Sequence, residues 1–172
     1  MEITLFPLEK AQIGGKTISF GMKKEEVHRL LGKPEFIDDD DESGERHYFY
    51  DSELAINFDK SGAVEFIEFL GGIDGTLKPL IYGISAFDSM ADELYEVLKK
   101  ENTGEIVDDE DGYSYSFKEI EVGVYRESKP EDAMDCIEEM KAEGTCTKED
   151  EEYELRRANH WATIGIGVKG YY

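Results

Sequence analysis

The sequence predicts an α+β fold in which two tandem helix-plus-antiparallel-hairpin repeats form one curved antiparallel sheet with the helices on one face. Three observations support this prediction. An acidic motif occurs twice, at residues 35–41 and 105–111, as one acidic residue, two apolar residues and an acidic run. An apolar stripe at helical spacing precedes each copy, and an alternating aromatic run follows it. Because self-similarity at a long period indicates repeats, we assign residues 1–76 and 77–172 to two repeats of a single compact unit.

The first half shows the pattern most clearly at its helix. Val27, Leu30 and Leu31 recur at helical spacing, and the stretch Gly32-Lys33-Pro34 supplies a glycine cap and a proline that cannot continue the helix. The predicted elements begin with a short strand, a turn at Gly14-Gly15, a strand over residues 17–20 and a helix over about 23–31. A charged hairpin loop over 38–44, two strands or one bent pair within 47–58, and a strand over 64–70 follow. The apolar phase of the last strand slips between Phe66 and Ile67, which indicates a bulge or burial on both faces.

The second half repeats this order and adds an insertion near residues 128–158. A helix is predicted over about 89–100, then strands, and a final strand over 161–168 that corresponds to residues 64–70. Within the insertion, residues 130–143 are expected to form a helix with Ser128 and Glu131 as its capping box. Residues 148–154 are too polar to pack, so we expect a solvated loop there.

The charge of the chain restricts its partners. Lys and Arg number 19 against 41 Asp and Glu, which gives a net charge of −22, well beyond the roughly 2–8 units of designed small domains. A field of this sign repels nucleic acid and anionic membranes and attracts basic proteins. The alternative is that the charge serves solubility alone. No export signal or run of about 18 apolar residues is visible, so we expect a cytoplasmic protein with both cysteines reduced.

Several motifs imitate binding or catalytic sites without completing them. The stretch from Gly165 to Gly170 is a literal G-x-G-x-x-G, but the helix that a dinucleotide site needs cannot follow it, so we expect its glycines to permit close packing in a strand. Asp39-x-Asp41-x-Ser43-Gly44 resembles a calcium loop, but Tyr50 stands where a bidentate Glu is needed. The spacing of the three histidines does not support zinc, and His28 is expected to face solvent. We therefore predict no catalytic residues, metal or cofactor.

Residues 18–34 resemble a motif of known protein families. Gly21-Met22 followed by Glu26-Val27, and Leu31-Gly32-Lys33-Pro34 at the end of the helix, are similar to the opening of the SmpA/OmlA-type outer-membrane assembly lipoproteins and of the β-lactamase inhibitory protein fold. The resemblance implies helices layered against an antiparallel sheet, in two tandem copies in the inhibitor. The second half departs from this motif, with Ala86-Phe87-Asp88 in place of the Gly-Met entry.

These observations favour a non-enzymatic, acidic protein-binding module. A cytoplasmic acidic protein of this kind resembles the immunity proteins that neutralise a basic toxin or enzyme domain. The alternatives are an enzyme or small-ligand-binding protein whose site is assembled from distant residues, and an accessory or regulatory module without an inhibitory role. The aromatic run over residues 113–117 is expected to be either core or recognition surface. The candidate partner-binding residues are Asp38, Asp39, Asp40, Asp41, Glu42, Tyr48, Tyr50, Asp108, Asp109, Asp111, Tyr113 and Tyr115.

Overall fold

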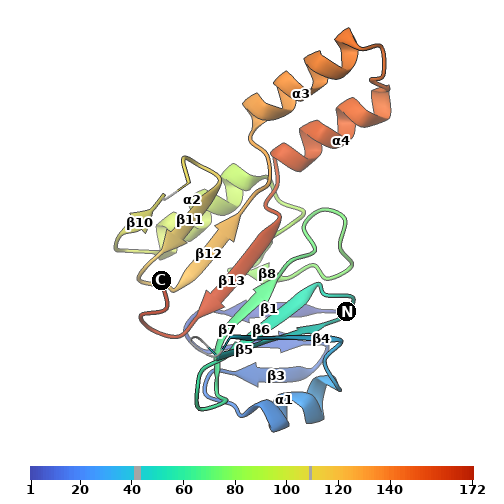
Figure 1. Cartoon of the computed structure of the whole chain (residues 1–172). Helices are drawn as coiled ribbons and strands as arrows, with labels where there is room; N and C mark the ends of the chain where they lie inside the picture. Colours follow the sequence, from blue (N-terminus) through green and yellow to red (C-terminus); the bar gives the residue numbers. More distant parts are fainter. Residues whose placement is uncertain (41–43, 109) are drawn as a thin grey trace.

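The structure, a computed structural model, describes residues 1–40, 44–108 and 110–172. Within these residues it is α+β, with four helices and two sheets (Figure 1). The predicted α+β class is therefore confirmed, whereas the strands divide between two sheets where a single sheet was predicted. The helices are α1 (Lys24–Leu31), α2 (Ala91–Glu101), α3 (Pro130–Ala142) and α4 (Lys148–Ala158).

The small sheet has the strand order β3-β2-β1-β8-β9. Its strands are β1 (Ile3–Phe6), β2 (Lys10–Ile13), β3 (Lys16–Ser19), β8 (Leu80–Ile81) and β9 (Ile84–Ser85). Strand β1 pairs with β8 in parallel, and the other pairs are antiparallel. Ile3, Leu5, Ala11 and Ile13 alternate with more exposed residues and are buried. This alternation gives the first hairpin an apolar face of its own, which packs as a second layer instead of extending the other sheet.

The large sheet has the strand order β10-β11-β12-β13-β7-β6-β5-β4, and every pair in it is antiparallel. Its strands are β4 (Phe36–Asp40), β5 (Gly44–Phe49), β6 (Leu54–Phe58), β7 (Val64–Phe69), β10 (Ile106–Val107), β11 (Ser114–Phe117), β12 (Val122–Tyr125) and β13 (Thr163–Gly167). Each half contributes a helix followed by four strands, and the halves meet where β7 pairs with β13. Both sheets thus contain strands from both halves, so the halves share one core.

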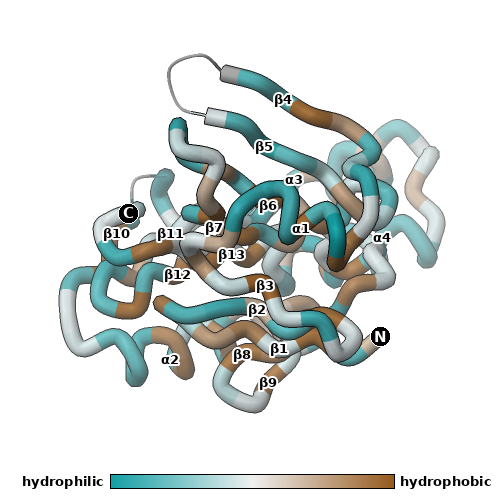
Figure 2. Tube along the Cα trace, turned by 90° about the horizontal axis from the view of Figure 1, so that it is seen from below, coloured by the Kyte–Doolittle hydropathy of each residue, from teal (hydrophilic) through white to brown (hydrophobic). Residues whose placement is uncertain are grey.

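The two faces of the large sheet differ in composition, as the cross-strand register shows. We call the face that carries the following row the covered face: Ile37, His47, Ile56, Ile67, Ile166, Val122, Phe117 and Ile106. We call the opposite face the open face, and its adjacent row consists of Phe36, Tyr48, Ala55, Glu68, Gly165, Gly123, Ser116 and Val107. The core lies against the covered face, where it includes residues of α1, α2 and the small sheet. Figure 2 shows α2 and the small sheet on the same side of β7 and β13.

The two acidic motifs that suggested the repeat differ in register by one residue. Phe36 follows Glu35 and lies on the open face, whereas Ile106 follows Glu105 and lies on the covered face. In a sheet, a slip of one residue exchanges the two faces. The motifs therefore do not occupy equivalent positions, although the order of elements around them is the same in both halves.

The expected bulge in the strand over residues 64–70 is present. Phe58 pairs with Val64 and Asn57 with Phe66, so Glu65 is the additional residue between them. Phe66 and Ile67 point to opposite faces and are both buried. The slip in apolar phase between Phe66 and Ile67 therefore corresponds to burial on both faces, and the bulge lies one residue earlier, at Glu65.

The insertion is a helical hairpin, α3–α4, which we call the arm. It projects from the two sheets (Figure 1). The expected helix over residues 130–143 is confirmed as α3, but its cap is Lys129, whose backbone N–H donates to Asp132 at 2.7 Å, and not Ser128 with Glu131. The loop expected over residues 148–154 is wrong, because α4 occupies it. Thr147 caps that helix by accepting from the backbone N–H of Asp150, and an acidic first turn complements the helix dipole.

Candidate functional site

The acidic residues predicted to bind a partner lie at the two edges of the large sheet. Asp38, Asp39 and Asp40 belong to β4, not to a loop as expected, because β4 continues to pair with β5 as far as Asp40 and Gly44. Asp38, Asp39, Asp108 and Asp111 are exposed. Asp41, Glu42 and Asp109 lie outside the described residues.

The structure separates these two acidic segments. Strands β4 and β10 are the opposite edges of the large sheet, and the seven antiparallel pairings between them make them run in opposite directions. The turns that follow them therefore lie at opposite edges and opposite ends of the sheet. With neighbouring strands about 4.8 Å apart, the two edges are roughly 34 Å apart along the sheet. The acidic segments thus form two separate regions and not one patch.

The predicted tyrosines divide between the faces. Tyr48 lies on the open face, where its hydroxyl accepts from Arg46 Nε at 2.9 Å and its ring lies 5.7 Å from that of Phe36. Tyr50 has a left-handed backbone (φ +56°) and packs against the core. Tyr113 precedes β11, and its hydroxyl donates to Asp132 Oδ2 at 2.6 Å.

Tyr115 lies on the covered face and contributes to the core. Its ring meets those of Tyr95 on α2 and Trp161, with centroids 4.8 and 6.0 Å apart. Burial and the neighbouring Asp108 carboxylate raise the pKa of Tyr115. Asp108 and Tyr115 are therefore predicted residues that the fold does bring together. The serines that alternate with Tyr115 in β11 lie on the open face.

The first half of the open face holds residues that no pattern in the sequence indicated. Arg46 pairs with Glu68 and also donates to Asn57 Oδ1 at 2.9 Å. Asn57 in turn donates to the hydroxyl of Tyr171 at 3.0 Å, and that ring stacks on Phe66 with 4.3 Å between centroids. These contacts join β5, β6, β7 and the residues after β13, so periodicity along any one segment could not reveal them.

The last residues of the chain lie on the open face because three glycines make room for rings. A Cβ at Gly165 would meet the ring of Phe66, one at Gly167 would meet Tyr171, and one at Gly123 would meet Tyr172. The predicted role of the glycines in close packing is thus confirmed for Gly165 and Gly167. The buried Glu121 carboxylate fixes this segment by accepting the backbone N–H groups of residues 170, 171 and 172 at 2.5, 3.1 and 3.0 Å.

A hydrogen-bonded chain of ionisable groups connects α1 to β5 on the covered side. His28 Nε2 lies 2.8 Å from His47 Nδ1, and His47 Nε2 lies 2.7 Å from Glu45 Oε2. Glu45 Oε1 accepts from Lys24 Nζ at 2.5 Å. Since the Glu45 carboxylate accepts from His47 Nε2–H, His47 Nδ1 is left to accept from His28 Nε2–H. His28 is half-buried, so the expectation that it faces solvent was wrong.

Burial and the neighbouring His47 ring hold the pKa of His28 below its usual value. Hydrogen bonds from Lys24 and His47 likewise hold the pKa of Glu45 below its usual value. The chain of contacts therefore favours neutral His28 and ionised Glu45. The separation of His28 and His47 in the sequence did not predict their contact, because that contact depends on how α1 crosses the sheet.

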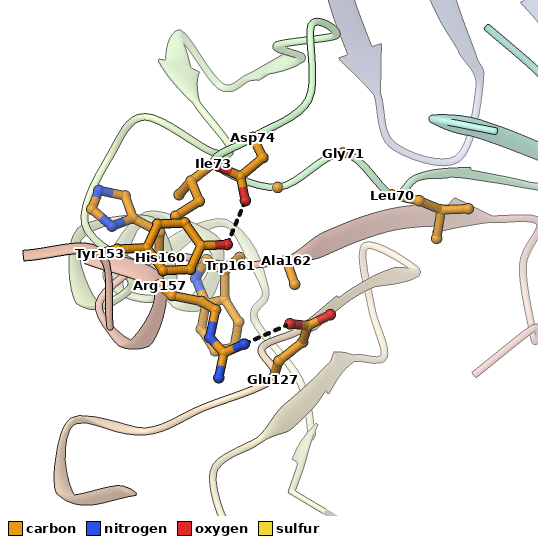
Figure 3. Close-up of a pocket in the computed structure, with 11 residues that line it drawn as sticks. Leu70, Gly71, Ile73, Asp74, Glu127, Tyr153, Arg157, His160, Trp161 and Ala162 are labelled. Carbon is orange, nitrogen blue, oxygen red and sulfur yellow. Dashed lines mark hydrogen bonds and ion pairs between the residues drawn. The ribbon is translucent and has the colours of Figure 1, made fainter. Parts of the chain in front are cut away.

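A small hollow of about 80 Å³ lies where the arm joins the body (Figure 3). The hydroxyl of Tyr153 on α4 donates to Asp74 Oδ2 at 2.7 Å, and Arg157 Nη1 lies 3.6 Å from Glu127 Oε2. Trp161 lines the same hollow, and its indole N–H donates to the carbonyl of Ala91 at 3.0 Å. The hollow has room for a few water molecules, and the Tyr153–Asp74 hydrogen bond connects the arm to the loop over residues 71–75.

Among the described residues, no group of three or more His, Cys, Asp or Glu side chains is arranged to hold a metal ion. Asp41 and Ser43 of the calcium-like motif lie outside those residues, so the prediction about calcium stays a prediction. In the same part of the chain, no helix is long and apolar enough to cross a membrane. Comparisons with protein-family models, curated proteins and solved structures found no match.

Proposed function

We propose that this protein is a non-enzymatic binding module for a basic protein, and that it acts in the cytoplasm as an immunity-type inhibitor of a basic toxin or enzyme domain. The observation that carries the proposal is the open face of the large sheet. It presents aromatic rings and carboxylates across a broad surface, and Arg46, on the strand next to one edge, is already paired with Glu68. Aromatic side chains supply large contact areas at protein interfaces.

The charge of the molecule supports a basic partner. The net charge is −22, and exposed carboxylates lie at both edges of the large sheet. Such a field raises the rate at which an oppositely charged protein associates, and salt screens the effect over about 10 Å at 0.1 M. A basic domain that covers the open face would lie between two acidic edges, which gives it charge complementarity on both sides.

We further infer that the two halves are tandem copies of one helix-and-four-strand unit, as in the β-lactamase inhibitory protein that residues 18–34 resemble. The matching order of elements supports this inference, as does the location of α1 and α2 on the same face of the large sheet. The one-residue difference in register between the acidic motifs means that the relationship rests on element order and not on those motifs.

A salt series with charge-reversal variants tests the proposed function. The partner to use is the product of the neighbouring reading frame, where a toxin gene is expected. We expect its association rate to fall steeply with added salt, and Asp38→Lys with Asp39→Lys to slow association. Asp108→Lys with Asp111→Lys should slow it independently, because the two regions are separate.

The matched control reverses two exposed carboxylates on the arm, Glu143 and Glu149. If the open face binds the partner, this control changes the rate less than either edge variant. An association rate that is indifferent to salt and to both edge variants would contradict the proposal and leave the charge as a solubility feature.

A further inference from the structure

The open face is hollowed in its second half. We call this feature the open-face hollow. It has a volume of about 260 Å³, and its polar lining comes from Glu68, Glu110, Ser114, Ser116, Thr163 and Tyr125. Strand β11 supplies the two serines, β12 the tyrosine, β13 the threonine and β7 Glu68. Four strands and the turn before β11 thus converge on one place.

The lining of the open-face hollow is suited to a cation. Glu68 and Glu110 contribute carboxylates, and Ser114, Ser116 and Thr163 contribute hydroxyl oxygens that can accept hydrogen bonds. The ring of Tyr125, which is 39% exposed, stands at the side. None of the described residues that line the hollow is basic. A lysine or arginine side chain offers only donors and a positive charge, so it is complementary to this lining.

Hydrogen bonds hold the floor of the hollow. Its floor includes Gly123, where a side chain would meet the ring of Tyr172. The backbone that carries this ring is held because Glu121 accepts the N–H of Tyr172 at 3.0 Å and those of the two preceding residues, and the ring itself packs edge to face against Phe66 and Tyr171. A site formed before binding loses less conformational entropy when a ligand enters.

The first half of the open face shows how a cation is accommodated on this sheet. Strand β5 is the second strand from one edge and carries Arg46 and Tyr48 on the open face, whereas β11 is the second strand from the other edge and carries Ser114 and Ser116 there. Arg46 reaches across its own half to Asn57 and Glu68. A hollow of about 370 Å³ also lies beside Arg46 and Tyr171 in the first half. In the second half, two short hydroxyl side chains occupy β11, and none of the described residues that line the open-face hollow next to the same Glu68 is basic.

We propose that the open-face hollow receives a lysine or arginine side chain of the basic partner. The proposal rests on the proposed function, because it names the contact through which the open face recognises that partner. Glu68 is shared with Arg46, so the exposed Glu110 supplies the carboxylate that meets the incoming cation. The serine and threonine hydroxyls accept its remaining donors.

A titration with a hexa-arginine peptide at low salt tests the proposal, with hexa-citrulline as the neutral control. We expect the largest amide shifts in the NMR spectrum at residues 114–116, 123–125 and 163. Ser116→Lys places an ammonium group of the protein itself in the hollow and should weaken hexa-arginine binding about tenfold or more, as blocking a central contact does. Thr103→Lys makes the same charge change at an exposed site after α2 and should have a much smaller effect.

Glu110→Gln provides a second variant at an exposed residue, where the fold is not at risk, and it should weaken binding more than Glu143→Gln on the arm. Chemical denaturation of each variant verifies that the fold is intact. If Ser116→Lys and Thr103→Lys weaken binding equally, or if the amide shifts concentrate elsewhere, the open-face hollow is not the site that receives the cation. The proposal of a basic partner would be unaffected by that result. No saturable binding of hexa-arginine would contradict the basic-partner proposal itself.

Discussion

Helices α1 and α2 lie on the same face of the large sheet, but they contact it through different chemistry. Helix α1 meets β5 through His28 and His47, whose rings are stacked with 5.0 Å between centroids and joined by a hydrogen bond. Helix α2 meets β11 through Tyr95 and Tyr115, whose rings pack edge to face. In both halves the contact is made on the strand next to the edge strand.

The difference shows that one fold position accepts either a polar or an aromatic pair, with different consequences. The aromatic contact depends on buried area and shape, which do not change with pH. The histidine contact depends on pH, because the shared hydrogen bond needs one ring nitrogen as its acceptor, and burial and the neighbouring His47 ring hold the pKa of His28 below its usual value. We therefore expect the first half to be sensitive to pH and the second half to be sensitive to side-chain truncation.

Truncation of Trp161 should have the largest effect on stability. The side chain is 2% exposed, it contacts Tyr115, and its indole N–H is hydrogen-bonded to Ala91. Trp161→Ala should lower the free energy of unfolding by about 3–5 kcal/mol, as for other buried aromatic residues. Tyr125→Ala, at an exposed position of the open face, is the control and should cost far less. Chemical denaturation measures both, and equal losses would show that the second half does not depend on this packing.

Removal of His47 should have the next largest effect. His47 is 1% exposed and bonds to both His28 and Glu45. His47→Phe leaves its half-buried partners without this contact, and loss of a hydrogen-bond partner below the surface typically costs about 1–3 kcal/mol. The control is His160→Phe at the base of the arm, where the imidazole bonds to a single backbone carbonyl. A His47→Phe variant as stable as the control would contradict the structural role of the histidine pair.

The pH dependence of stability should distinguish the two halves without any truncation. The pKa of His28 is lowered in the folded state by burial and by His47, while Lys24, Glu25 and Glu45 also face it. The unfolded chain, with a histidine pKa near 6.5, then binds more protons than the folded chain below that value. Stability should therefore be fully present above about pH 6.5 and should fall as the pH decreases from there toward the lower folded pKa.

Glu45 contributes with the same sign at lower pH. Its pKa is lowered by Lys24 and His47, so its stabilisation is present above its unfolded value and is lost as the pH falls through the folded one. Unfolding curves between pH 8 and pH 5 for the native protein and His28→Phe isolate the histidine contribution. An identical slope in both proteins would show that His28 is not the titrating group.

The fold class and many elements could be predicted from the sequence because they depend on local patterns. Helix α1 ends at Gly32, where the backbone is left-handed (φ +98°), as the Gly-x-Pro stretch predicted. The polar stretch that became α4 was misjudged for a physical reason. A helix in a two-helix arm needs only a narrow apolar stripe, which Leu155 and Ala158 supply, and its first turn is stabilised by a cap and by charge.

The candidate site could be predicted in part only. The exposure of Asp38 and Asp108 follows from their charge, whereas the separation of their segments follows from strand order, which composition does not encode. The two acidic motifs are similar in sequence, yet Phe36 and Ile106, which hold the same position in them, point to opposite faces of the sheet. Arg46, Glu68 and Glu121 could not be selected beforehand, because their partners lie on other strands or at the end of the chain.

A substitution in the arm should have the smallest effect on the free energy of unfolding. It tests whether the arm and the rest of the second half open as one unit. Tyr153→Phe removes the hydrogen bond to Asp74 and little else, since the ring is 42% exposed. The free energy of unfolding should fall by only about 0.5 kcal/mol, at the low end for a hydrogen bond that water can replace. Amide hydrogen exchange is the sharper measurement of this contact, because local opening responds to local contacts.

In Tyr153→Phe, amide exchange should become faster in α4 and stay unchanged in β13, and Tyr125→Phe on the open face should change neither. If α4 keeps its exchange rates, the Arg157–Glu127 pair and the packing of α3 against α4 suffice to hold the arm. If β13 exchanges faster as well, the arm and the large sheet open together, which means that the insertion and the aromatic contacts of the second half belong to one cooperative unit.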